Sequence, residues 1–362
     1  MSRAFREFLD RDYIEDIDGR LFTVVGGAHP SDRVISYLKY KPSREGIKSI
    51  WSRNGVGYTR MMPRYGAYEV LKQLSSLPSS YIRYDRILGF KMIEIPKQYI
   101  RRHYIPEERL NQIIKRPRDK LEYLVRDLVL ELSSYISEDY TVFGITGSIL
   151  LGIHNVDYSD IDLTIYGFKN ALELRKVMND IFSNVGTFSR LKGSILERYI
   201  GELVKTYPLS NYEARRYLNE TWSRGLYKGK FFSIHPVLKS DEISVRYGEQ
   251  SYRGLGLIKF TAEVIDDRYS LFNPAIYRIR IRRLIKLPHI IEAINLYKIT
   301  EVVSYEGIYS GIARVGECIE VSGKLERVYD IRYGSYYRVL IGSFDARGLD
   351  YIKPVRWFET TS

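Results

Sequence analysis

The segment from Gly144 to Tyr166 constrains the fold more than any other part of the chain. Tyr140–Thr146 reads as a short buried strand, Gly147-Ser148 follows as a turn, and a short helix is expected from Ile149. The run Ile161-Asp-Leu-Thr-Ile-Tyr166 then alternates as a second strand. A strand, a tight turn, a short helix and a second strand in this order predict an α+β core.

Two carboxylates stand where the second strand begins. Asp160 and Asp162 are two residues apart, so in a strand they face the same side. Adjacent carboxylates repel each other unless a cation neutralises them, and such oxygen ligands suit Mg²⁺ shared with substrate phosphates. We therefore expect Asp160 and Asp162 to be metal ligands and catalytic residues. Two surface aspartates are the structural alternative.

The turn before the short helix has the composition of a phosphate-binding loop. Gly147 would let the backbone approach a phosphate closely, and the Ser148 hydroxyl would donate to one. We expect Gly147 and Ser148 to bind the triphosphate while the aspartates hold the metal.

Together these motifs resemble the Gly-Ser and Asp-x-Asp signature of the DNA polymerase beta-like nucleotidyltransferase superfamily. More closely, the chain resembles a group of archaeal predicted nucleotidyltransferases. The segments that carry the resemblance are Ala28–Arg33, Gly144–Leu150, Ser159–Asp162 and Val264–Asp267. It implies Mg²⁺- or Mn²⁺-dependent transfer of a nucleoside monophosphate from a nucleoside triphosphate, ATP included, to a hydroxyl, with pyrophosphate released.

The superfamily's third carboxylate has no evident counterpart here. The matching strand, Lys230–Val237, offers Ser233 or His235 toward the site by alternation. His235 is a candidate catalytic base, and the alternative is a packed or surface histidine on a β-strand. This departure also leaves open a different class of function: a nucleotidyltransferase fold that has lost catalysis and acts as a nucleic-acid or ribonucleoprotein binding module.

Composition predicts three domains. A small N-terminal α+β domain is expected over residues 1–108, the nucleotidyltransferase core over 109–252, and a β-rich, OB-like domain over 253–362. Spacing of Leu121, Leu124, Leu128 and their neighbours predicts a long helix in the core, and Asp18-Gly19 predicts an N-terminal hairpin.

Charge favours a polyanionic partner. The formal net charge is +12, which favours RNA, such as a tRNA-like end, as the acceptor. Arg278, Arg280 and Arg282 share one face of a predicted strand and are candidates for phosphate contacts. A solvated strand guarded by charge is the alternative, and a protein or small-molecule acceptor remains open.

The sequence disfavours a protein with a structural transition-metal site, a membrane protein and a secreted protein. Cys318 is the single cysteine and the five histidines are scattered, so a structural transition-metal site is not expected. No stretch of about 18 apolar residues occurs and the N-terminus lacks the apolar core of a signal peptide. We expect a cytoplasmic protein without membrane contact.

Overall fold

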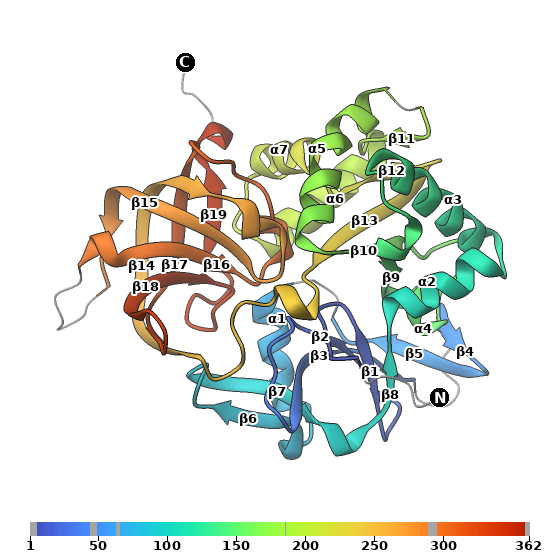
Figure 1. Ribbon diagram of the computed structural model, residues 1–362, viewed down its shortest axis with the longest axis horizontal. Helices are drawn as coiled ribbons and strands as arrows, with labels where there is room; N and C mark the ends of the chain where they lie inside the picture. The colour runs from blue at the N-terminus through green and yellow to red at the C-terminus, as the bar shows by residue number, and fades with distance from the viewer. Residues whose placement is uncertain (1–5, 44–48, 63–65, 185, 289–294, 359–362) are drawn as a thin grey trace. The chain divides into compact units, whose positions relative to one another are not determined.

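The computed structural model describes residues 6–43, 49–62, 66–184, 186–288 and 295–358 (Figure 1). These residues form a mixed α+β protein with three β-sheets, so the predicted α+β class is confirmed. Within the described ranges, none of the helices has the length and apolar composition needed to cross a membrane.

Two compact units interleave along the sequence. The first comprises Met1–Pro63, Ile93–Arg190 and Trp222–Ser244, and the second comprises Arg64–Met92, Leu191–Thr221 and Val245–Ser362. The unit boundaries neither coincide with nor exclude the three-domain division at residues 108 and 252, which stays a prediction.

The first unit contains most of an N-terminal antiparallel sheet. Its strands run in the order β4-β5-β3-β2-β1-β8, with β7 paired to β3 and β6. The bounds are β1 Tyr13–Asp16, β2 Leu21–Val24, β3 Arg33–Pro42, β4 Trp51–Arg53, β5 Val56–Arg60, β6 Ile82–Asp85, β7 Phe90–Pro96 and β8 Ile100–Tyr104. The predicted hairpin is confirmed as β1 and β2, where Gly19 takes a φ of +77° that suits glycine.

A second sheet in the same unit has the order β11-β12-β13-β10-β9 (Figure 1). Its strands are β9 Phe143–Ile145, β10 Ile161–Tyr166, β11 Phe188–Ser189, β12 Arg224–Tyr227 and β13 Lys230–Val237. β10 and β13 are parallel, and both match the predicted strands. The helices are α2 Pro106–Lys115, α3 Lys120–Tyr135, α4 Gly147–Leu151 and α5 Phe168–Asn184.

Alternation along β10 and β13 separates an apolar face from a polar one. Ile161, Leu163 and Ile165 are fully buried, and Phe232 stacks on Phe182 of α5 with 6.3 Å between ring centroids. The opposite face carries Asp162, Ser233 and His235. On that side, Tyr40 of the N-terminal sheet shares an apolar cluster with Leu150 and Leu151 of α4.

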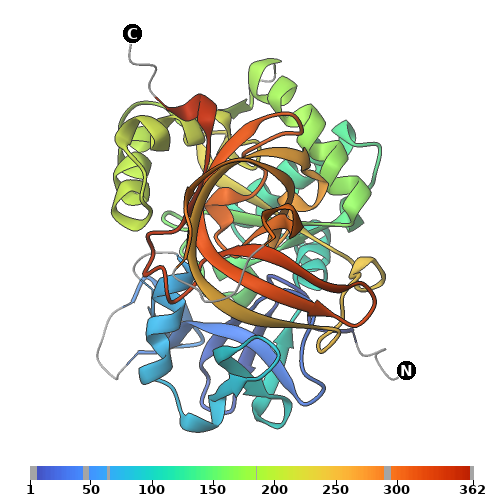
Figure 2. The ribbon, with the colours of Figure 1, turned by 90° about the vertical axis from the view of Figure 1, so that its left-hand side faces the viewer.

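The second unit contains a sheet that closes on itself. Its order is β14-β15-β16-β18-β17-β19, and an additional pairing joins β14 to β17. Figure 2 shows these strands curling around a common interior. Phe260, Val321 and Val339 of these strands are fully buried. The strands are β14 Gln250–Asp266, β15 Ala275–Lys286, β16 Ile299–Ser304, β17 Cys318–Asp330, β18 Gly334–Ile341 and β19 Tyr351–Pro354; the helices are α1 Ala67–Lys72, α6 Gly193–Thr206 and α7 Asn211–Glu220.

Candidate functional site

The candidate site is centred on Asp162 in β10. Its register partner on β13 is Ser233, and the register partner of Ser233 on β12 is Arg224, so the three side chains form a row across the sheet. Ser233 is buried, and its hydroxyl donates to Asp162 Oδ1 at 2.6 Å. The Asp162 side chain is 37% exposed, so its carboxylate is open to solvent.

His235 completes a chain of hydrogen bonds. Its Nε2 lies 2.9 Å from Ser233 Oγ and 3.9 Å from Asp162 Oδ1. An ionised carboxylate only accepts, so Ser233 donates to Asp162 and in turn accepts from a protonated His235 Nε2. The structure therefore gives His235 a contact that holds Ser233 in place.

The pKa values of both groups are lowered, which keeps the pair in one charge state at neutral pH. Burial, reinforced by the positive charge of Arg11, lowers the pKa of His235 to about 4. Burial opposes ionisation of Asp162, but hydrogen bonding and neighbouring positive charge outweigh it and hold its pKa below the usual range. At neutral pH the site has a neutral imidazole and an ionised carboxylate. The hydrogen bond from His235 to Ser233 favours a positioning role for His235, and its lowered pKa is consistent with that role.

The Gly-Ser turn meets the carboxylate directly. Gly147 has a φ of +68°, and a Cβ added there would stand 2.7 Å from Asp162 Oδ2. The Thr146 N–H donates to the Asp162 carbonyl at 2.8 Å, which ties the turn to β10. The positive φ of Gly147 and the nearness of the Asp162 carboxylate explain why a residue without a side chain occupies position 147.

Ser148 is hydrogen bonded within the loop that leads to β10. Its hydroxyl donates to Ser159 Oγ at 3.2 Å, and the Asn155 N–H donates to the same oxygen at 3.0 Å. A phosphate at the turn would have to compete for the Ser148 hydroxyl. Ser148 and Gly147 nevertheless lie together at the start of α4.

Asp160 differs from Asp162 in its surroundings. It is exposed and lies one residue before β10 begins. Its charge favours the protonated form of Lys230, whose pKa is nevertheless lowered, mainly by burial. Asp157 is also exposed and forms an ion pair with Lys120 at 2.6 Å.

The acidic residues after β13 do not supply a third carboxylate to the site. Both oxygens of Glu242 accept from the Phe168 N–H, at 2.9 and 3.0 Å, which caps the start of α5. Asp241 is exposed in a 3₁₀ turn. The position beside Asp162 is occupied by Ser233, as alternation predicts.

Cations of the N-terminal region also lie around Asp162, and no motif pointed to them. The charges of Arg11 and Lys39 both act on Asp162, and that of Arg60 acts on Lys39. Lys39 is only 7% exposed, and burial with nearby positive charge lowers its pKa. A lysine inside the otherwise buried stretch of β3 is the one sequence signal that marks this group.

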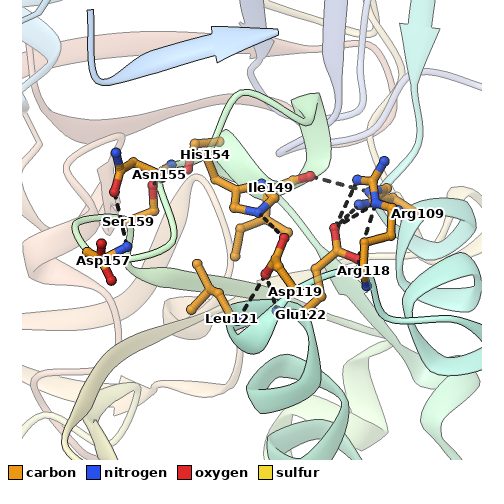
Figure 3. A network of polar contacts seen from close by, with 11 residues as sticks. Arg109, Arg118, Asp119, Leu121, Glu122, Ile149, His154, Asn155, Asp157 and Ser159 are labelled. Carbon is orange, nitrogen blue, oxygen red and sulfur yellow. Dashed lines mark hydrogen bonds and ion pairs between the residues drawn. The ribbon is translucent and has the colours of Figure 1, made fainter.

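Among the residues described, one further cluster has metal-ligand chemistry: Asp119, Glu122 and His154 (Figure 3). Asp119 Oδ1 caps α3 by accepting from the Leu121 and Glu122 N–H groups, and His154 Nε2 lies 3.0 Å from Asp119 Oδ2. Glu122 is fully buried and accepts from the guanidinium groups of Arg109 and Arg118. Internal bonds therefore account for the cluster without a metal ion.

The predicted nucleic-acid contacts lie on β15 in the second unit. Arg278, Arg280 and Arg282 have exposed side chains, and the residues between them are buried or partly buried. Arg278 lies 3.3 Å from Glu301, Arg280 lies 3.8 Å from Glu263, and Arg282 also pairs with Glu263. Two carboxylates thus offset part of the charge of this face.

Comparison with known proteins assigns the chain to a protein family. The described residues define an α+β protein in which a Gly-Ser turn lies against an acidic strand. The chain is 31% identical over 357 residues to "Uncharacterized protein MJ1086" of Methanocaldococcus jannaschii, with 95% of this chain and 98% of the relative covered. The chain therefore belongs to the same family as this archaeal protein. No family model and no solved structure matches the chain.

Proposed function

We propose that this protein is a nucleotidyltransferase that moves a nucleoside monophosphate from a nucleoside triphosphate to a hydroxyl acceptor. The observation that carries the proposal is the close approach of Gly147 to Asp162 Oδ2. Polyphosphate at the Gly147-Ser148 turn would lie beside the carboxylate that a nucleotide-bound cation needs. In the reaction, the acceptor oxygen bonds to the α-phosphorus, the bond to pyrophosphate breaks, and the hydroxyl proton is released to water.

The donor set fits Mg²⁺ delivered with the nucleotide. Asp162 Oδ1 is engaged by Ser233, while the carboxylate remains open to solvent and Asp160 is exposed one residue before the strand. We propose Asp160 and Asp162 as the ligands of Mg²⁺ or Mn²⁺, with phosphate and water oxygens as the others. When bound, the cation would neutralise the triphosphate and stabilise the leaving pyrophosphate. Ser233, held by His235, fixes the direction of Asp162.

Incorporation of label tests this proposal directly. The purified chain would be mixed with Mg²⁺, each radiolabelled triphosphate and an acceptor: total tRNA, a short RNA, or the chain alone. Label in one acceptor fraction is expected, and Asp162→Asn should abolish it. Asp157→Asn is the matched control, because Asp157 is an exposed aspartate nearby that pairs with Lys120. Incorporation that survives Asp162→Asn would contradict the assignment.

Two observations favour a second candidate, a nucleotide- and RNA-binding module without catalysis. Ser233 stands at the register position beside Asp162, and Glu242 is committed to capping α5. This candidate predicts triphosphate binding without incorporation into any acceptor, an outcome that the same assay separates.

We propose RNA as the acceptor or partner, through the closed sheet. The order β14-β15-β16-β18-β17, closed by the β14–β17 pair, resembles the five-stranded barrel of OB-folds, which bind oligonucleotides. The arginines of β15 add positive charge to this sheet. A protein that transfers to RNA would label the tRNA or RNA fraction, whereas label on the chain alone would contradict an RNA acceptor.

A further inference from the structure

A left-handed residue brings one cation to the site. Arg11 has a φ of +71°, a conformation uncommon outside glycine that persists where surrounding contacts impose it. Its carbonyl accepts from Thr146 Oγ1 at 2.7 Å, immediately before the Gly147 turn. Its Nε lies 3.2 Å from Asp10 Oδ2, and its charge acts on Asp162.

An irregularity in strand β3 brings a second cation, Lys39, to the site. Leu21 of β2 pairs with Tyr40, whereas the next residue, Phe22, pairs with Leu38, so Lys39 is the extra residue of a β-bulge in β3. A bulge re-aims a side chain that alternation would send to the opposite face. Tyr40, next to it, pairs with Arg60 across β3 and β5, and the charge of Arg60 acts on Lys39.

Several basic groups lie around the Asp162 carboxylate. Arg11 and Arg60 are permanently charged, and Lys39 is a third basic group whose pKa is lowered by burial and by both arginines. Arg224, in register with Ser233, adds another cation. Burying cations together is costly, and phosphate oxygens offset that cost through charge-assisted hydrogen bonds. The side chains of Arg11 and Asp162 are 25% and 37% exposed, so a ligand can reach them from solvent.

We propose that Arg11, Lys39 and Arg60 bind the oligophosphate chain of the ligand that the Gly147-Ser148 turn would also contact. The inference rests on the proposed function for the identity of the nucleotide, but the set would bind any linear oligophosphate. Residues of the N-terminal region thereby become part of the binding site. Arginine offers paired donors to phosphate oxygens, and lysine offers a compact charge.

Calorimetry of the full chain with inorganic tripolyphosphate, in the presence of a chelator, tests the set without metal or catalysis. Binding is expected, and Lys39→Met should weaken it about tenfold, as expected for a lost contact to a charged group. Lys41→Met is the matched control, because Lys41 is exposed two residues further along the same strand, and it should change binding by less than about twofold. Arg60→Gln serves as a second variant.

Asp162→Asn separates this inference from the proposed function. Without metal the Asp162 charge repels phosphate, so Asp162→Asn should strengthen tripolyphosphate binding while it abolishes nucleotide transfer. Titration with ATP in parallel distinguishes a nucleotide from a free oligophosphate, because tighter ATP binding requires contacts to the nucleoside. The inference is overturned if the parent binds no tripolyphosphate, or if Lys39→Met and Arg60→Gln both bind like the parent. Tripolyphosphate binding without transfer would uphold the inference and contradict the catalytic proposal.

Discussion

Ser233 and Asp162 occupy register partners on parallel strands and are joined by a 2.6 Å hydrogen bond. Ser233→Ala removes this bond and leaves His235 Nε2 without its acceptor. We expect about 1 kcal/mol lower stability and a roughly tenfold lower transfer rate, because Asp162 is held less firmly. Thermal unfolding and incorporation kinetics measure the two effects. Ser233→Thr keeps the hydroxyl and should restore most of the rate; an equal loss in both variants would contradict the positioning role.

Gly147 and Gly152 form a matched pair at the two ends of α4. Both have positive φ, +68° and +65°, but a Cβ at Gly152 meets only Arg53 at 3.9 Å. Alanine at either position should cost about 1–2 kcal/mol for the left-handed backbone. Only Gly147→Ala displaces the Asp162 carboxylate, so only that variant should lose Mg²⁺–nucleotide affinity. Calorimetry with both variants checks this; equal affinities would remove the turn from the site.

The arginines of β15 predict a limited salt dependence of RNA binding. Neutralising Arg278, Arg280 and Arg282 together should flatten the salt slope by about one to two units rather than three, because Glu301 and Glu263 already offset part of their charge. Glu263→Gln should instead strengthen binding by freeing Arg280 and Arg282. Anisotropy of labelled single-stranded RNA over a salt series measures both. An unchanged slope in the triple variant would exclude this face.

Glu306 in the second unit predicts a loss of stability with rising pH. Burial, with the nearby charge of Asp350, raises its pKa from 4.5 to about 7. Its contribution is therefore complete below pH 4.5 and is lost as pH rises through 7, a change of about 3 kcal/mol. Glutamine has no charge to lose or gain, so the Glu306→Gln variant should not show this loss. The difference in free energy of unfolding between the variant and the parent should therefore shift in favour of the variant by about 3 kcal/mol from pH 4 to pH 8.5. Denaturant unfolding at both pH values measures it; parallel pH profiles would contradict the prediction.

Local pattern in the sequence predicts much of the fold and part of the site. The bounds of β10 and β13 follow from alternation, and the placement of Ser233 and His235 beside Asp162 follows from the same rule. The prediction places Asp160 and Asp162 on one face of a strand, but β10 begins at Ile161, one residue after Asp160. The turn at Gly147 follows from the tolerance of glycine for a positive φ, and its role in phosphate binding stays a prediction.

The cations around Asp162 could not be predicted in the same way. Lys39 reaches the site through a bulge, and a bulge depends on the pairing of β2 with β3 rather than on either strand alone. Arg11 is placed by a contact with Thr146, 135 residues away. Glu242 similarly became a helix cap through packing of distant segments. These are tertiary relationships, which local propensity does not encode.

The parallel pairing of β10 with β13 has a consequence for synthesis of the chain. The register partners Asp162 and Ser233 are 71 residues apart in the sequence. At roughly 5–20 residues per second, this spacing is a delay on the order of 4–14 s. During that interval the β13-facing edge of β10 has no native partner, since α5 and the segments up to Trp222 emerge first. An open strand edge of this kind pairs readily with other chains. A nascent protein stalled before Lys230 should therefore be the form most prone to aggregate on the ribosome.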